Sequence, residues 1–518
     1  MSDEGTGALE YHERTSHTPR SVRRASPGLD FENKPRPYEI YESLPQVGLD
    51  EVRAPQVPAL SAITASGPDG DGRSPTLETL TTLCHYSAGI TKRIRRGNRE
   101  TEFRAAAATG ALYHVDCYLV VGPLDGLPAG VYHFDPRTRS LDVLREGDYR
   151  GVLAAASRSE AVDRAPVTVV TTSTWWRNAW KYRERTFRHA FWDSGTVLAN
   201  LLSVAHAHNL RAEAVLGFAD DPVAELLGVD PEREAPLELV PIGVGDSAPD
   251  ALDPEPIDPE TRPLSDREEE FPLIHEAWRA GTLPDGETAR EWRSTAAETS
   301  LDGPETSAVP RSSPAGPEAE ARIALDPVDH ETQSKRPLGE TIERRGSCRE
   351  YEREPISFRK FSTVLDRAIR GAPIDARGGE EPLSFVEPYS IVNGVEEIPA
   401  GAYRYRPDEG ELERLMAGEF REEAGHLALD QRLAADAAAC VYFLADLDRL
   451  VDALGDRGYR LAQFEAAITA GRLYLATYAH RDLGGTGLTF YDDLVTDFFS
   501  PHAGGRAPMF LYTLGRPA

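Results

Sequence analysis

An internal repeat is the feature that most constrains how this chain can fold. The segment Leu127-Pro-Ala-Gly-Val-Tyr-His-Phe-Asp-Pro136 returns as Ile398-Pro-Ala-Gly-Ala-Tyr-Arg-Tyr-Arg-Pro407, 271 positions later. At an offset of 272, Arg188, Asp193, His208 and Phe218 correspond to Arg460, Glu465, His480 and Phe490. Such a steady offset over about a hundred residues indicates a tandem duplication of one domain.

The residue pattern of each unit predicts an α+β fold. A Pro-Ala-Gly turn precedes a β-type run, and an apolar strand follows at residues 167–170 or 440–444. Apolar residues at helical spacing then predict a long helix, from Phe187 to about His208 and from Tyr459 to about His480. Each unit ends in a β-run closing on Gly243 or Gly515. The alternation is not strictly βαβ, which favours a mainly antiparallel sheet flanked by helices.

With 518 residues the chain exceeds one ordinary core, and we expect four segments. These are a mostly irregular N-terminal extension (1–70), a first domain (71–245), an acidic Pro-rich linker (246–335) and a second domain (336–518). Within the linker, helical spacing predicts one docking helix from Arg267 to Ala280.

The charge balance narrows the possible partners. The net charge is −28, and only five of the 57 basic residues are lysine. This balance argues against nucleic acid, because phosphate backbones are neutralised by Lys and Arg. Dense carboxylates are typical of a halophilic protein, while few lysines could equally reflect a high-GC genome. No apolar run is long enough for a membrane helix, and the polar N-terminus is unlike a secretory signal, so we expect a cytoplasmic protein with no membrane partner.

The four cysteines, Cys84, Cys117, Cys348 and Cys440, are far apart and form no CxxC pair. No Cys/His spacing suits a metal, so we predict buried thiols and no metal site.

The second unit opens with a candidate phosphate-binding segment. Arg344, Arg345, Ser347 and Arg349 supply three guanidinium groups and a hydroxyl, which can converge on a phosphate. The alternative is a solvated basic turn at a helix end.

Glycines follow the long helix of the second unit. Gly484, Gly485 and Gly487 would let the backbone approach a planar ligand closely. The alternative is a simple helix C-cap. Further on, Arg506 could add another cation to a phosphate, or lie in a surface loop.

This set, in this order, resembles the nitroreductase superfamily, and within it the SagB-type dehydrogenases, the azoline oxidases of thiazole/oxazole peptide maturation. The resemblance implies FMN, with its phosphate at Arg344, Arg345, Ser347 and Arg349 and the Gly-rich turn beside the flavin. It also implies a dimer interface, with a loop from the other subunit matched here by Thr109, Gly110 and Ala111. The first unit lacks the Arg-rich segment and the second lacks the loop. We therefore expect an intrachain pseudo-dimer with one composite FMN site.

Lys181 and Tyr182 match a Lys-Tyr pair that contributes to catalysis in the azoline oxidases. Near flavin N5 either side chain could act as general acid or base. The alternative is that Lys181 pairs with Glu184 and that Tyr182 packs in the core.

The leading hypothesis is an FMN-dependent oxidoreductase that transfers hydride through flavin N5, with NAD(P)H as a possible electron donor. One alternative is an NAD(P)H-dependent nitro- or quinone reductase, and another is a non-catalytic scaffold on a decayed nitroreductase fold. The resemblance implies a small-molecule or modified-peptide substrate. The protein is expected to be a monomeric pseudo-dimer or a homodimer.

Overall fold

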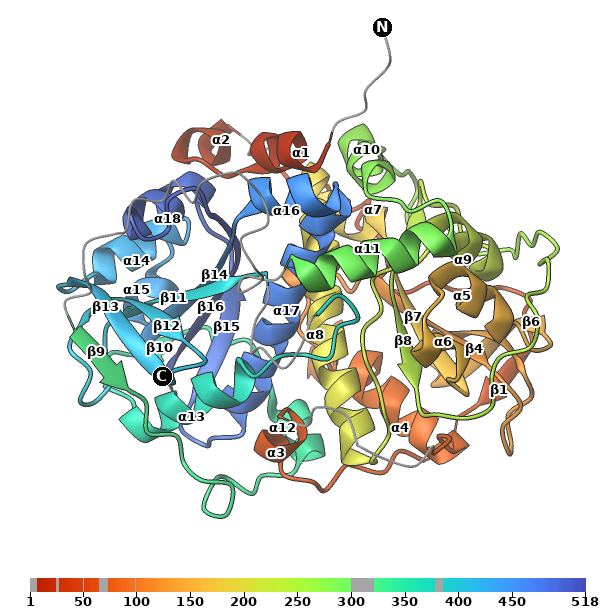
Figure 1. Ribbon diagram of the computed structural model, residues 1–518, viewed down its shortest axis with the longest axis horizontal. Coiled ribbons are helices and arrows are strands. Elements are labelled where there is room, and N and C mark those ends of the chain that lie inside the picture. Colours follow the sequence, from red (N-terminus) through yellow and green to blue (C-terminus); the bar gives the residue numbers. More distant parts are fainter. Residues whose placement is uncertain are drawn as a thin grey trace, which may run out of the picture.

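The computed structural model describes residues 7–24, 28–49, 51–64, 73–97, 99–299, 321–377 and 385–518. Two α+β halves lie side by side, each built on an antiparallel sheet with helices packed around it (Figure 1). One continuous hydrophobic core runs through both halves, and a smaller one lies on the outer face of the first sheet. The predicted fold class, a tandem α+β protein with mainly antiparallel sheets, is confirmed.

The first sheet has the strand order β1-β6-β5-β4-β7-β8. The strands are β1 (Gln46–Gly48), β4 (Val115–Val121), β5 (Gly130–Asp135), β6 (Ser140–Glu146), β7 (Val167–Thr174) and β8 (Glu234–Ile242). Its helices are α3 (Ala59–Ala62), α4 (Leu77–Ala88), α5 (Arg150–Ser157), α6 (Glu160–Asp163), α7 (Trp175–Tyr182), α8 (Thr186–Ala207) and α9 (Asp220–Leu227).

The second sheet has the order β10-β16-β14-β11-β12-β13-β9, with β15 also paired to β16. The strands are β9 (Ala321–Ala324), β10 (Tyr351–Glu352), β11 (Glu387–Val392), β12 (Gly401–Arg406), β13 (Glu411–Ala417), β14 (Ala439–Ala445), β15 (Gly484–Leu488) and β16 (Ala507–Pro517). Its helices are α12 (Leu338–Arg344), α13 (Phe358–Ala368), α14 (Arg421–Leu427), α15 (Arg432–Asp436), α16 (Leu447–Leu454), α17 (Arg457–Tyr478) and α18 (Asp492–Phe499).

The long helices α8 and α17 form the contact between the halves, and small residues allow their close approach. A Cβ atom added at Gly195 would lie 2.5 Å from the Cβ of Ala467. One added at Gly471 would lie 2.5 Å from the Cβ of Ala199. Gly195 and Ala467 occupy equivalent positions in the repeat, as do Ala199 and Gly471. Each residue therefore meets its own counterpart, which places a pseudo-twofold axis between the two helices.

Two reciprocal ion-pair clusters cross this interface. Arg185 and Arg188 of the first unit bind Asp492 of the second at 3.2 and 2.5 Å. Equivalent residues make the mirrored contact, because Arg457 and Arg460 bind Asp220 at 2.6 and 2.8 Å. All six side chains are at most 4% exposed. Although burial disfavours the charged carboxylate, Arg185 and Arg188 hold the pKa of Asp492 well below its ordinary value.

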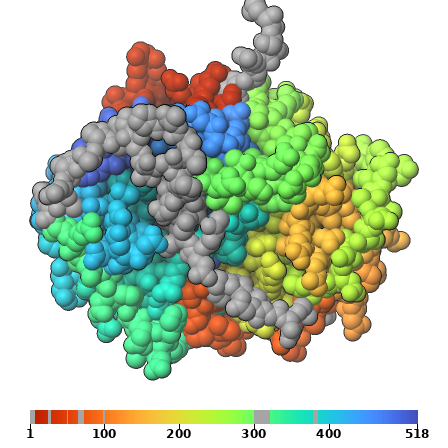
Figure 2. Space-filling view, in the orientation of Figure 1, coloured from red at the N-terminus to blue at the C-terminus, as the bar shows by residue number. Residues whose placement is uncertain are grey.

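The repeat extends further toward each N-terminus than the sequence indicates. The backbone carbonyls of His12 and Thr15 on α1 (Ala8–Thr15) accept from Arg188 and Arg185. In the second unit the carbonyls of Trp278 and Gly281, at the end of α10 (Pro272–Ala280), accept from Arg460 and Arg457. Figure 1 shows α1 and α10 near the junction of the halves, and in Figure 2 the red N-terminal helices lie against the blue second unit.

From these equivalences we propose a division of the chain that differs from the expected one. The docking helix predicted for the linker corresponds to α10, and in the proposed division it forms the start of the second unit together with α11 (Gly286–Glu298) and β9. The N-terminal extension is likewise structured, with α1, α2 (Pro19–Arg24), β1 and α3. We therefore propose unit boundaries near residues 245 and 271; the predicted boundary at 70/71 lies outside the described residues.

A hairpin of β2 (Ile90–Arg96) and β3 (Arg99–Arg104) precedes the loop to β4 in the first unit. Within the described ranges, no helix is both long and apolar enough to cross a membrane.

Candidate functional site

The loop after β3 carries three of the predicted site residues in a short 3₁₀ turn, Thr109–Ala111. Gly110 has φ +64°, a left-handed conformation that favours glycine. The carboxylate of Asp193, on α8, accepts from the Thr109 backbone N–H at 2.8 Å and from its hydroxyl at 2.7 Å. Asp193 thus fixes this loop against the interface helix.

Lys181 and Tyr182 lie at the C-terminal end of α7, directly beside this loop. A Cβ atom built on Gly110 would lie 2.7 Å from the Tyr182 hydroxyl oxygen and 3.4 Å from Lys181 Nζ. The Lys181 ammonium lies 4.8 Å from the centroid of the Tyr182 ring. The two candidate catalytic residues therefore share one small region with Thr109, Gly110 and Ala111. Among the described residues, Lys181 and Glu184 do not form the ion pair that was the alternative. The Glu184 carboxylate instead contacts Arg183 at 3.6 Å.

A chain of aromatic side chains links this region to the second unit. The Tyr182 ring meets His189 edge-on, with centroids 4.7 Å apart, and His189 lies 5.0 Å from Trp192. Trp192 then contacts Phe510 of the second unit at 5.3 Å. A Cβ atom on Gly487 would lie 3.1 Å from the Phe510 ring. The structure thus brings Gly487 and Tyr182 to the same interface from opposite units.

The glycines after α17 form a strand rather than the predicted turn. Gly484, Gly485 and Gly487 belong to β15, which pairs antiparallel with β16. A Cβ atom at Gly485 would overlap the Tyr512 hydroxyl, so glycine is required there by packing. The Gly487 N–H donates to the Tyr474 hydroxyl at 2.6 Å.

Arg344 is used within the second unit. Its guanidinium donates to the carbonyl oxygens of Tyr478, His480 and Arg481 at 2.6–2.9 Å. These carbonyls lie at and beyond the end of α17, where backbone acceptors lack partners within the helix. The structure therefore gives Arg344 a helix-capping contact.

Arg345, Ser347 and Arg349 are placed differently. Arg345 reaches across the interface, donating to the carbonyls of Ala105 at 3.0 Å and Arg104 at 3.1 Å. Ser347 is half-buried and Arg349 is exposed. In the part of the chain that the structure describes, neither of these two side chains makes a hydrogen bond or ion pair, which leaves both available to an anion.

Arg506 lies away from this group. It precedes β16 at the end opposite Gly484, which pairs with Gly515. Its guanidinium donates to Glu387 at 2.9 Å. The structure thus brings Arg345, Gly487, Gly110, Lys181 and Tyr182 to one interface and does not bring Arg506 there.

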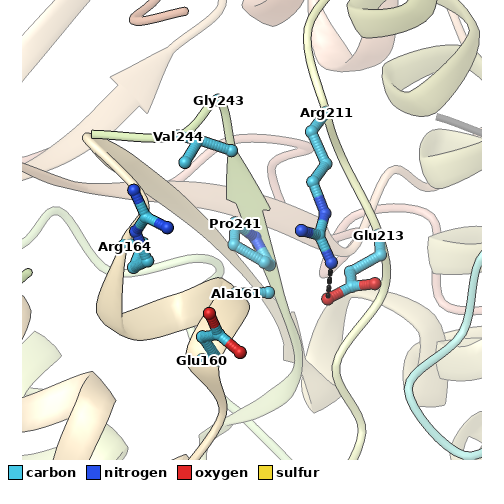
Figure 3. Close-up of a pocket in the computed structure, with 8 residues that line it drawn as sticks. All are labelled: Glu160, Ala161, Arg164, Arg211, Glu213, Pro241, Gly243 and Val244. Carbon is cyan, nitrogen blue, oxygen red and sulfur yellow. Dashed lines mark ion pairs between the residues drawn. The ribbon is translucent and has the colours of Figure 1, made fainter. Parts of the chain in front are cut away.

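The mirrored position, which is the place in the first unit that is equivalent to β15 of the second, is built from different residues. The segment 211–215 runs beside β8 as β15 runs beside β16, through the bridges Ala212–Ile242 and Val215–Leu239. Glu213 therefore stands where the second unit has Gly485, and burial raises the pKa of its carboxyl. Figure 3 shows Glu213 turned toward Arg211 in a pocket that is also lined by Arg164 and Glu160. The Glu213 carboxylate and the Arg211 guanidinium are 3.9 Å apart.

Arg185 is a further candidate site residue, which the sequence did not indicate. It is 4% exposed, and its guanidinium lies over the rings of Trp192 (5.8 Å) and Phe490 (5.7 Å). Its Nε and Nη2 atoms have no hydrogen-bond partner among the described residues. Its counterpart Arg457 donates from Nε to the Leu216 carbonyl at 2.8 Å. In the sequence, Arg185 is marked by its match to Arg457 in the repeat. That match does not indicate that the Nε and Nη2 atoms of Arg185 lack hydrogen-bond partners in the described part of the chain.

These donors suit an anionic, planar ligand. Arg349 and Ser347 can bind a phosphate. The unpaired N–H groups of Arg185, which lie among aromatic rings, can bind ring carbonyl oxygens. The residues present therefore fit FMN. Among the described residues, no group of three or more His, Cys, Asp or Glu side chains could hold a metal ion.

Known proteins resemble this chain in part or throughout. The "Nitroreductase family" matches residues 75–244. A Methanocaldococcus jannaschii protein classed as a nitroreductase (MJ1384) is 27% identical over 169 residues, 32% of this chain and 80% of that protein. The trifolitoxin-processing protein TfxB of Rhizobium leguminosarum is 26% identical over 31% of this chain, and the microcin B17-processing protein McbC of Escherichia coli is 26% identical over 25%. The chain spans about half the length of these two relatives, 45% and 49%.

One solved structure matches almost the whole chain. A crystal structure from Anabaena variabilis, classed as a nitroreductase, has a TM-score of 0.70 and 25% identity, and covers 99% of both chains. The fold of both units is therefore shared with that protein, and residues 75–244 of this chain match the nitroreductase family.

Proposed function

We propose that this protein is an FMN-dependent oxidoreductase with one composite site between its units. The observation that carries the proposal is the continuous contact path from β15 of the second unit, through Phe510, Trp192 and His189, to Tyr182. Arg345 adds a second crossing of the same interface. The match of residues 75–244 to the nitroreductase family supports oxidoreductase chemistry.

The proposed roles follow from position. Arg349 and Ser347 bind the phosphate, and Arg345 sets the distance between that segment and the first-unit loop. Arg185 donates to a ring carbonyl. When bound, FMN supplies a hydride acceptor and donor at N5. Lys181 and Tyr182 supply or remove the proton that accompanies hydride transfer.

The mirrored position supports a single site. Glu213 places a carboxyl where Gly485 gives an open backbone, and Arg211 turns toward it. A carboxylate there opposes an anionic cofactor, so we expect the second position to stay without flavin.

A purified, FMN-loaded sample tests the proposal. We expect a yellow protein whose flavin absorbance is bleached by NAD(P)H or by a reduced substrate. Protein that binds no FMN would overturn the proposal and leave the scaffold alternative.

The names of two relatives, processing proteins for microcin B17 and trifolitoxin, favour a modified peptide as substrate over a small nitro or quinone compound. Bleaching by NAD(P)H within milliseconds to seconds would instead favour an NAD(P)H-dependent nitro- or quinone reductase. Sedimentation would show whether the fused pseudo-dimer is a monomer or pairs further.

A further inference from the structure

Two hydrogen-bonded groups of mostly buried polar side chains, together called the network, lie around Tyr182 and Gly110 in the first unit. We propose that this network positions the first-unit side of the composite site: it fixes the Gly110 loop and the Tyr182 ring relative to each other. This inference rests on the proposed function, and none of the network residues other than Thr109 was singled out as a site residue from the sequence. The network consists of Thr109, His114, Ser173, Asn178, His189 and Asp193.

One arm of the network fixes the loop. The Ser173 hydroxyl lies 2.9 Å from His114 Nδ1, and His114 Nε2 lies 3.0 Å from Asp193 Oδ2. The carboxylate of Asp193 then holds both the N–H and the hydroxyl of Thr109, immediately before Gly110. His114 and Ser173 are fully buried and Asp193 is 4% exposed, so this arm is screened from water.

The other arm fixes the ring of Tyr182. The Asn178 side-chain oxygen lies 2.9 Å from His189 Nδ1 and accepts from the Thr186 hydroxyl at 3.0 Å. The imidazole of His189 then packs at 89° to the Tyr182 ring. Burial, together with the nearby Arg185 charge, holds the pKa of His189 well below its ordinary value, which disfavours the protonated imidazole.

The second unit offers an internal comparison, because its equivalent positions are apolar. His114, Ser173, Asn178 and His189 correspond to Phe385, Ala445, Leu450 and Leu461. Only the anchor is kept, since Glu465 at the position of Asp193 accepts from the backbone N–H groups of Phe385 and Val386 at 2.7 and 3.0 Å.

The comparison of the two units distinguishes a role of the network in stability from a role in positioning. Buried polar groups contribute little more to stability than well-packed apolar ones, and the second unit folds with the apolar set. The polar residues stand beside Lys181 and Tyr182, while the equivalent positions of the second unit are apolar. This contrast indicates that the polar residues fix the orientation of the groups they contact. Hydrogen bonds fix orientation, and a misplacement of about 1 Å can reduce turnover about 100-fold.

The first test needs no flavin. In Asp193→Ala, hydrogen–deuterium exchange of the FMN-free protein should become about tenfold faster or more in a peptide covering residues 105–113, while residues 385–392 are unchanged. The matched control Glu465→Ala should show the opposite pattern. Unchanged exchange at residues 105–113 in Asp193→Ala would overturn the inference, whether or not the protein binds FMN.

The second test uses the FMN-loaded protein. In Asp193→Ala and in His189→Leu, which copies the second unit, we expect kcat to fall about 10- to 100-fold while the Kd for FMN changes less than about threefold. Asp193→Asn keeps an acceptor for Thr109 and should recover part of the loss. Wild-type kcat in both variants would overturn the inference and leave the flavin proposal standing; absence of FMN from the wild-type protein would overturn the flavin proposal alone.

Discussion

The two halves of this molecule have the same fold and differ in what they place at their shared interface. The first half presents Lys181, Tyr182 and the Gly110 loop, held by polar side chains. The second presents β15 and the Arg345–Arg349 segment, with apolar residues where the first has its polar network. Both copies have therefore kept the packing and the ion pairs of the interface, whereas each copy contributes different residues to the one proposed site.

The largest effect is expected when the candidate proton donors of the first half are removed. Lys181→Ala and Tyr182→Phe should each lower the turnover of the FMN-loaded protein about 100-fold or more, because a proton is transferred together with each hydride. The equivalent second-unit positions are Ala453 and Leu454, which lack such groups. The control Lys360→Ala, which removes a partly exposed ion pair with Asp482, should keep wild-type turnover. Normal turnover in both site variants would remove their catalytic role.

The reciprocal ion pairs test the symmetric part of the comparison. Asp492→Asn and Asp220→Asn each leave two buried arginines without their carboxylate, and should lower the free energy of unfolding by about 3–5 kcal/mol. Calorimetry of both variants should give similar losses. A large loss in one and none in the other would contradict the pseudo-twofold arrangement.

Acid should weaken the Asp492 cluster. Because the folded-state pKa of Asp492 lies below its ordinary value of 3.8, its stabilisation is complete above that value and is lost as the pH falls below it. The difference in stability between wild type and Asp492→Asn should therefore shrink in denaturant titrations below about pH 4. A difference that stays constant down to pH 2 would contradict this assignment.

A smaller effect is expected at the candidate phosphate site. Arg349→Ala should weaken FMN binding about tenfold, about 1.4 kcal/mol, while the Tm of the FMN-free protein stays unchanged. The matched control Arg359→Ala breaks only an exposed pair with Asp326 and should leave the Kd for FMN as it is. Equal affinity in Arg349→Ala and wild type would exclude Arg349 from the phosphate site.

The smallest effect is expected in the mirrored position. Burial raises the folded-state pKa of Glu213, so its carboxyl contributes stability below its ordinary pKa and loses it as the pH rises. Glu213→Gln should therefore stabilise the protein slightly near neutral pH, by less than about 1 kcal/mol, with no gain at pH 4. A loss of stability at neutral pH would show that the ionised carboxylate is needed there.

Much of the fold could be predicted because the repeat is visible in the pattern of side chains along the sequence. The strands and the helices α8 and α17 keep their apolar pattern, since most of their side chains are buried. The match between α1 and α10 could not be seen, because their shared contacts run through backbone carbonyls, which any residue supplies.

The candidate site was predictable only in part. Thr109, Gly110, Lys181 and Tyr182 were found by motif and lie together. Arg344 binds helix-end carbonyls instead of lying free for a ligand, and whether an arginine does so depends on tertiary contacts. The glycines at 484–487 read as a turn, although packing against Tyr512 is what requires Gly485. The contrast of His189 with Leu461 was visible in the repeat and had no meaning until His189 was seen against Tyr182.

The division of labour between the halves is tested most directly by the number of FMN molecules bound per chain. Titration of flavin-free protein, followed by flavin absorbance against protein concentration, should saturate at one FMN per chain and lose that binding when the Arg345–Arg349 segment is altered. Saturation at two FMN per chain would contradict the account, because it would require the position of Glu213 to hold a flavin as well.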